Sequence, residues 1–150
     1  MRENPTRVRT GSWLAALALL AAPALAAGPG VLKIDQAAYF GTEGTTVTIL
    51  IERSQGEDGP ASVRLVSNGG TATPGADYAA VDVLLQWAAG DGGDRFVQIP
   101  LVDDTEAEPT ETIQLALVDA TGASLDPERA TSVVNIGDND GGSGGSGGSG

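Results

Sequence analysis

The segment TTVTILIER (residues 45–53) alternates polar and apolar side chains. Val47, Ile49 and Ile51 point to one side of an extended chain, and Thr46, Thr48 and Glu52 point to the other. A period of two residues is typical of a β-strand with one buried face and one solvated face. The same pattern recurs in residues 94–102 and 111–118, whose inward sets are Val97, Ile99, Leu101 and Ile113, Leu115, Leu117.

Similar short runs continue on both sides of this segment, separated by clusters of Gly, Pro, Asp and Asn. They predict seven strands, at residues 31–40, 45–53, 61–67, 79–87, 94–102, 111–118 and 130–137. Between residues 27 and 140 no apolar stripe of helical period persists for more than about two turns, so helix is not expected. Strands at this spacing predict an antiparallel sandwich or barrel. We expect four aromatic residues in its core or at the core's edge: Phe40, Tyr78, Trp87 and Phe96.

The two ends of the chain differ in composition from the part between them. Residues 1–26 carry three arginines, an apolar run from Trp13 to Ala22 and the small-residue site Ala24-Leu25-Ala26, which together predict a secretory signal peptide. That run is shorter than the roughly 20 residues needed to span a bilayer. Residues 141–150 read as a flexible Gly/Ser linker. We therefore expect one domain at 27–140 that is secreted or displayed on a cell surface, with the periplasm as an alternative destination.

Charge and residue usage restrict the function. The formal net charge of −12 disfavours nucleic acid and anionic membrane surfaces as partners and favours cations. The chain has neither cysteine nor histidine. It therefore lacks the usual general base for a serine nucleophile and the common ligands of structural zinc.

The carboxylates become informative once the loops are sorted by end. If consecutive strands are antiparallel, the loops at 41–44, 68–78 and 103–110 and the chain after 137 share one end of the domain. That end, which we call the acidic pole, contains no basic residue in these loops, whereas Arg53, Arg95 and Arg129 accompany the acids of the other end. Crowded carboxylates repel one another, and calcium offsets such repulsion through six to eight oxygen ligands in irregular geometry. The candidate ligands are Glu43, Asp77, Asp103, Asp104, Glu106, Glu108, Glu111, Asp138 and Asp140.

Two other interpretations stay open at this point, and a third is excluded. The acids could be solvated loop charges on a metal-independent spacer. Two of them could serve a glycosidase, but sugar clefts are usually lined with aromatic residues and only Tyr78 falls near the acidic pole. An EF-hand is excluded, because DNDGGSGGSGGS (138–149) lacks the acidic residue required at position twelve. We expect a binding module rather than an enzyme.

Several stretches resemble the Calx-β domain of sodium/calcium exchangers and of bacterial surface and secreted proteins. They are Glu43-Gly44, GGTATPGADY (69–78), WAAGDGGDRFVQIPLVDDTEAEPTET (87–112) and NIGDND (135–140). The resemblance implies a seven-stranded immunoglobulin-like Greek-key sandwich with a calcium cluster at one end. The matching motifs also imply that the nine residues named above are the calcium ligands, with Glu106 acting through its backbone carbonyl. Neutral Asn139 stands where related domains often continue an acidic run, which bears on the number of ions.

These observations together predict a secreted or surface-displayed module with Ca²⁺ as its only cofactor. In this interpretation the ion stiffens the loops and supports adhesion, matrix or spacer roles. Beyond calcium, a protein or cell-surface partner is compatible with the sequence, and no stable membrane span is expected in the mature domain.

Overall fold

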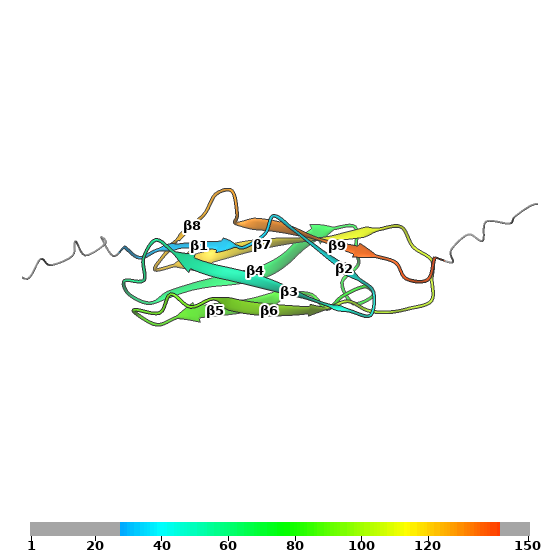
Figure 1. The fold of residues 1–150 in the computed structure, drawn as a ribbon, viewed down its shortest axis with the longest axis horizontal. Helices are drawn as coiled ribbons and strands as arrows, with labels where there is room; N and C mark the ends of the chain where they lie inside the picture. The colour runs from blue at the N-terminus through cyan, green and yellow to red at the C-terminus, as the bar shows by residue number, and fades with distance from the viewer. Residues whose placement is uncertain (1–27, 142–150) are drawn as a thin grey trace, which may run out of the picture.

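The computed structural model describes residues 28–141, and the predicted signal peptide and all but the first residue of the linker lie outside this range. The described residues form two β-sheets and no helix (Figure 1). A four-stranded sheet has the order β6-β3-β1-β8, and a five-stranded sheet has the order β2-β9-β7-β4-β5. The strands are β1 (Val31–Ile34), β2 (Ala38–Thr42), β3 (Thr46–Ser54), β4 (Ala61–Gly70), β5 (Asp82–Trp87), β6 (Arg95–Pro100), β7 (Glu111–Thr121), β8 (Ser124–Leu125) and β9 (Thr131–Gly137).

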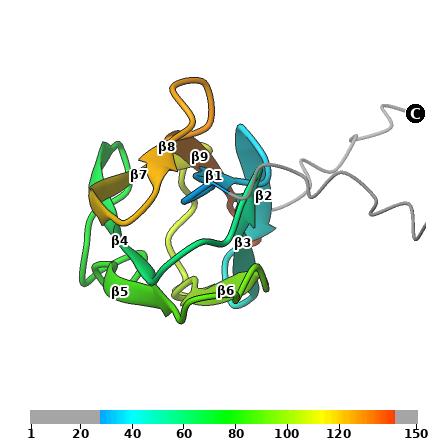
Figure 2. The same cartoon turned by 90° about the vertical axis from the view of Figure 1, so that its left-hand side faces the viewer.

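The two sheets pack face to face around one apolar core (Figure 2). The inward sets predicted from the alternation of β3, β6 and β7 are all buried there. Ile49 lies opposite Val97 and Val47 lies opposite Ile99, so these side chains stack in pairs on the inner face of the four-stranded sheet. β3 pairs with β6 although two strands separate them along the chain, as a Greek-key sandwich requires. The predicted all-β sandwich is therefore confirmed.

The number and direction of the strands differ from the expectation of seven antiparallel strands. The first predicted strand, 31–40, divides into β1 and β2, which belong to different sheets. The buried positions reveal the break, because Leu32 and Ile34 are even-numbered whereas Tyr39 is odd-numbered. One uninterrupted strand could not turn all three side chains inward. After the break, β2 pairs in parallel with β9, and the two-residue strand β8 pairs in parallel with β1.

The aromatic residues divide into two groups. Tyr78 and Trp87 are each only 2% exposed, as expected. The expectation was wrong for Phe40 and Phe96, which are 79% and 65% exposed. Each of these two is adjacent in sequence to an inward residue, Tyr39 or Val97, so the strand period points the phenylalanine outward.

Arg53 organises the end of the sandwich opposite the acidic pole. Its side chain is almost fully buried, and the guanidinium donates hydrogen bonds to backbone carbonyl oxygens from three segments. The shortest are 2.9 Å from Nη2 to Pro29 O, 3.0 Å from Nη2 to Gly59 O and 3.1 Å from Nη1 to Asp91 O. A buried charge is tolerated when it is fully hydrogen-bonded. We call this end, where the described chain begins, the entry pole.

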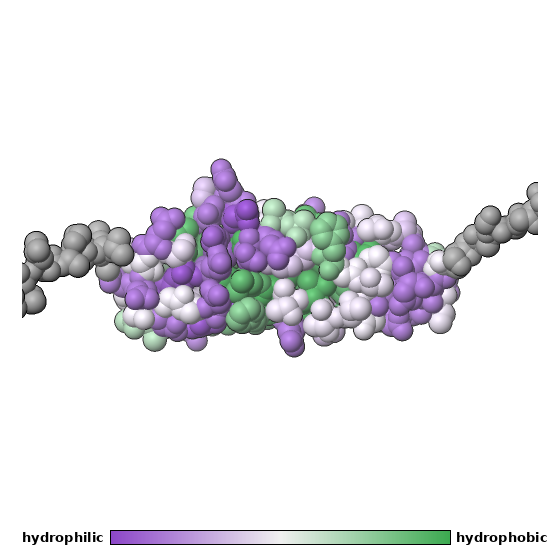
Figure 3. All heavy atoms as spheres, in the orientation of Figure 1, coloured by the Kyte–Doolittle hydropathy of each residue, from purple (hydrophilic) through white to green (hydrophobic). Residues whose placement is uncertain are grey.

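The surface is hydrophilic at both ends of the long axis, with apolar residues visible between them (Figure 3). Within residues 28–141, no helix is long and apolar enough to cross a membrane.

Candidate metal centre

Four segments meet at the acidic pole, at the right-hand end of Figure 1: the β2–β3, β4–β5 and β6–β7 loops and the chain after β9. Backbone hydrogen bonds join them. Glu43 N donates to Gly137 O at 3.1 Å, and Val102 N donates to Asp77 O at 2.8 Å. The sorting of loops by strand direction therefore predicted correctly which segments converge.

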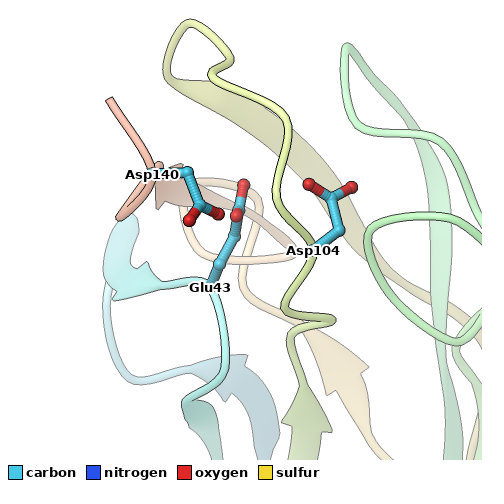
Figure 4. A group of neighbouring side chains, drawn as sticks. All are labelled: Glu43, Asp104 and Asp140. Atoms are coloured by element: carbon cyan, nitrogen blue, oxygen red, sulfur yellow. The ribbon is translucent and has the colours of Figure 1, made fainter. Parts of the chain in front are cut away.

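Glu43, Asp104 and Asp140 form the first carboxylate group (Figure 4). Each offers an oxygen, and these three atoms lie within 4.8 Å of one another. Glu43 comes from the β2–β3 loop and is only 8% exposed, whereas Asp104 is exposed in the β6–β7 loop. Asp140 lies three residues after β9, and its side chain approaches that of Glu43. Residues almost a hundred positions apart thus share one small volume.

Asp77, Glu108 and Glu111 form the second group, with the same 4.8 Å limit between their oxygens. All three side chains are half-buried. Asp77 is held in place because its Oδ2 accepts a hydrogen bond from Thr73 N at 2.5 Å. Glu111 is the first residue of β7, so the strand fixes its backbone, and Glu108 comes from the loop before it.

The other three predicted residues lie at the same pole but in neither group. Asp103 Oδ1 accepts a 2.7 Å hydrogen bond from Asn139 Nδ2. Asp138 accepts from the backbone N–H groups of Asp140 and Gly141, each at 2.8 Å, so it caps the turn that carries Asp140. Glu106 is exposed, and its N–H donates to Asp104 Oδ1 at 2.7 Å.

Asn139 has a role that the sequence did not reveal. Its amide donates to Glu43 O at 3.4 Å as well as to Asp103, and so links the chain after β9 to two loops. An amide can donate to a carboxylate where a third acid at 138–140 would repel it. The single Asn within the acidic run of residues 138–140 is the signal that could have indicated this role.

The crowding shifts the acid–base equilibria of the carboxyl groups. Burial, followed by the negative charges of Asp138 and Asp104, raises the pKa of Glu43. Burial, a hydrogen bond with Asp77 and the charge of that residue together raise the pKa of Glu111 to about 7. The pKa of Glu108 is raised by burial and then by the charge of Asp77, and that of Asp140 by burial and then by the charge of Asp138. Asp138 is the exception, because the hydrogen bond from Asp140 N and further backbone N–H groups lower its pKa.

No salt bridge among the described residues compensates this charge. The salt bridges of residues 28–141 join Lys33 to Glu52, Arg64 to Asp82 and Arg95 to Asp91, all away from the acidic pole. Two oxygens of the first group, Glu43 Oε2 and Asp140 Oδ2, are buried and have no hydrogen-bond partner. A buried carboxylate without a partner is costly. The donor set consists of oxygens on irregular loops, which fits a hard cation of calcium type.

The fold and this pole together define the class: a two-sheet β-sandwich that gathers two groups of three carboxylates at one end. The Calx-beta domain family matches residues 27–140, and the chain belongs to that family. Calx-beta domains are non-catalytic modules, which supports the expectation that this domain is not an enzyme.

Solved structures share the fold. The apo form of the Calx CBD1 domain superposes with a TM-score of 0.68 at 23% identity, covering 73% of this chain and 97% of that one. The calcium binding domain CBD12 of CALX1.1 gives a TM-score of 0.66 at 24% identity, covering 73% and 44%. Among curated proteins, the adhesion G-protein coupled receptor V1 of Danio rerio is 40% identical over 80 residues. That match covers 53% of this chain and 1% of the receptor's length.

Proposed function

We propose that this domain is a secreted or surface-displayed module that binds calcium at the acidic pole. The observation that carries the proposal is the pair of buried, unpartnered oxygens, Glu43 Oε2 and Asp140 Oδ2, within a group of three carboxylates. Solvated loop charges would keep their oxygens in water, so the metal-independent spacer does not account for this burial. Family membership supports the same conclusion, because Calx-beta domains bind Ca²⁺.

The two carboxylate groups would hold the ion or ions. Glu43, Asp104 and Asp140 supply three acidic ligands at one position, and Asp77, Glu108 and Glu111 supply three at the other. We assign Asp103, Asp138 and the carbonyl of Glu106 as further oxygen donors, as the motif match implies. When bound, calcium supplies positive charge that offsets the repulsion among these groups, and no chemical step is required of it.

Binding would act through stability and stiffness. The first group draws its ligands from three segments, so an ion held there restrains the β2–β3 loop, the β6–β7 loop and the chain after β9 together. Sites of extracellular modules bind with dissociation constants of about 10⁻⁴–10⁻³ M. At 1 mM calcium such a site stabilises the folded domain by roughly 0.4–1.4 kcal/mol through mass action.

The extracellular assignment draws on the signal-peptide pattern of residues 1–26 and on the similarity to an adhesion receptor. A calcium-stiffened module in that setting suits adhesion, matrix or spacer roles.

Calorimetric titration with calcium, and with magnesium for comparison, tests the proposal. We expect calcium to bind more tightly, because magnesium demands near-octahedral geometry that loop carboxylates do not provide. If no binding heat is measured and the melting temperature is the same in millimolar calcium and in excess chelator, the domain is a metal-independent spacer.

A further inference from the structure

We propose that this domain is a load-bearing link in which tension along the chain shears β2 against β9, and that calcium at the acidic pole locks the loaded end of this strand pair. The second half rests on the proposed function.

The path of the chain sets the direction of a pull. The described chain begins at the entry pole and ends at the acidic pole, at opposite ends of the long axis (Figure 1). β1, β2 and β9 all run from the first end toward the second. Tension applied through Gly28 and Gly141 therefore acts along the axes of the terminal strands.

The parallel pairing of β2 with β9 places these strands in shear. Five residue pairs join them, from Ala38 with Val133 to Thr42 with Gly137. The pull reaches β2 at its beginning, through β1, and reaches β9 at its end, so the two strands are drawn past each other. Ladder hydrogen bonds run across the strands. Shear therefore loads all the hydrogen bonds of the pair at the same time. Peeling one strand from its end would instead break them one after another.

The entry pole prevents β1 from peeling off first. β1 lies between β3 and β8 in the sheet, and four residue pairs hold it to β3. Before β1 begins, Pro29 O accepts hydrogen bonds from Arg53 Nε and Nη2, and Gly28 O accepts one from Asp58 N at 3.0 Å. The buried guanidinium thus attaches the incoming chain to the loops of its own end.

The acidic pole closes the other end of the sheared pair. Glu43 is the first residue after β2, and Asp140 follows β9 by three residues, yet both belong to the first carboxylate group. The Glu43 N to Gly137 O bond and the Asn139 amide already join these segments. An ion held by Glu43 and Asp140 adds a bridge that must break before β9 can slide along β2.

Constant-force measurements on single molecules of the full chain test this inference. The sequence contains no cysteine, so cysteines added before Met1 and after Gly150 give specific handles for an axial pull. In the control, Asp94→Cys replaces the second handle and both handles act at the entry pole. Asp94 is an exposed residue directly before β6. This transverse pull separates the ends of β1 and β6 and unzips their pairing with β3.

We expect the folded state to survive longer under an axial pull than under a transverse pull of equal force. Forced unfolding is governed by the unfolding rate, and an interaction slows unfolding only if it must break before the transition state is reached. The bridge through the ion at the acidic pole must break in the axial pull, whereas it is still held when the transverse pull opens the entry pole. Calcium at 1 mM should therefore lengthen the axial lifetime by about 2- to 11-fold, the factor that matches the expected stabilisation, and leave the transverse lifetime nearly unchanged.

The outcomes separate the two proposals. If calcium raises the melting temperature but leaves the axial lifetime unchanged, the mechanical inference is overturned and the calcium site stands. If calcium changes neither, the proposed function fails, and the calcium lock fails with it. Axial and transverse lifetimes that are equal in chelator would overturn the shear geometry itself.

Discussion

Replacing Asp104 by Asn tests the first carboxylate group with minimal change of shape. The substitution removes one of three acidic ligands while keeping an oxygen at the same place. Removing even a hydrogen-bond partner of a metal ligand typically weakens metal affinity by about 10- to 100-fold. We therefore expect the calcium affinity of Asp104→Asn to fall by at least about tenfold.

That loss converts into a measurable change in thermal stability. Calcium at ten times its dissociation constant stabilises the parent domain by about 1.4 kcal/mol, but a tenfold weaker site at the same concentration gains only about 0.4 kcal/mol. For a domain of this size these energies correspond to calcium-dependent rises in melting temperature of roughly 5–10 °C for the parent and about 2–3 °C for the variant. Differential scanning calorimetry in calcium and in chelator measures both.

Asp119→Asn is the matched control. Asp119 is exposed near the end of β7 that points away from the acidic pole, and its substitution changes the net charge by the same one unit. Its φ of 53° is left-handed, a conformation that Asn tolerates as readily as Asp. We expect this variant to keep the full calcium-dependent rise. Equal calcium affinities and equal rises in the two variants and the parent would refute the assignment of Asp104 as a ligand.

Three further outcomes are expected. Calcium removal should speed hydrogen exchange in the loops of the acidic pole and leave β3, β6 and β7 protected, because their apolar inner faces do not depend on the ion; exchange that is unchanged by chelator would favour the plain spacer. In chelator the melting temperature should fall between about pH 5 and pH 8. The pKa of Glu111 is raised from 4.5 to about 7 in the folded state, so protonated Glu111 favours folding. This contribution to stability is complete below pH 4.5 and is lost as the pH rises through about 7. The pKa of Asp138 is lowered from 3.8, so this residue changes the stability only below about pH 3.8, outside this window. Glu111→Gln should flatten the melting profile, and an equal slope in the variant would contradict the assignment. Gly41→Ala should destabilise the domain by about 1–3 kcal/mol, since its Cβ would lie 2.5 Å from Val47 Cγ2 and 2.7 Å from Leu101 Cδ1; urea unfolding with an unchanged midpoint would show that the packing there relaxes.

The alternation of side chains determined the sandwich. In β3, β6 and β7 the large inward-facing apolar residues recur at every second position, and a strand geometry with that period buries one face. The same local rule placed the loops at alternate ends and so predicted that Glu43, Asp104 and Asp140 would converge. Applied more strictly, it would also have placed Phe96 outside, whereas the outward position of Phe40 follows only from the break between β1 and β2.

Long-range pairing is what the sequence left undecided. The break between β1 and β2 and the parallel partners of both strands depend on which sheet offers a free edge, and no local pattern encodes that. The gathering of six of the nine acids into two groups of three, with Asn139 joining the chain after β9 to two loops, likewise depends on distances of a few ångströms between segments remote in sequence. Side-chain period is a local property of the chain and can be read from it, whereas the burial of Glu43 Oε2 exists only once four segments are packed together.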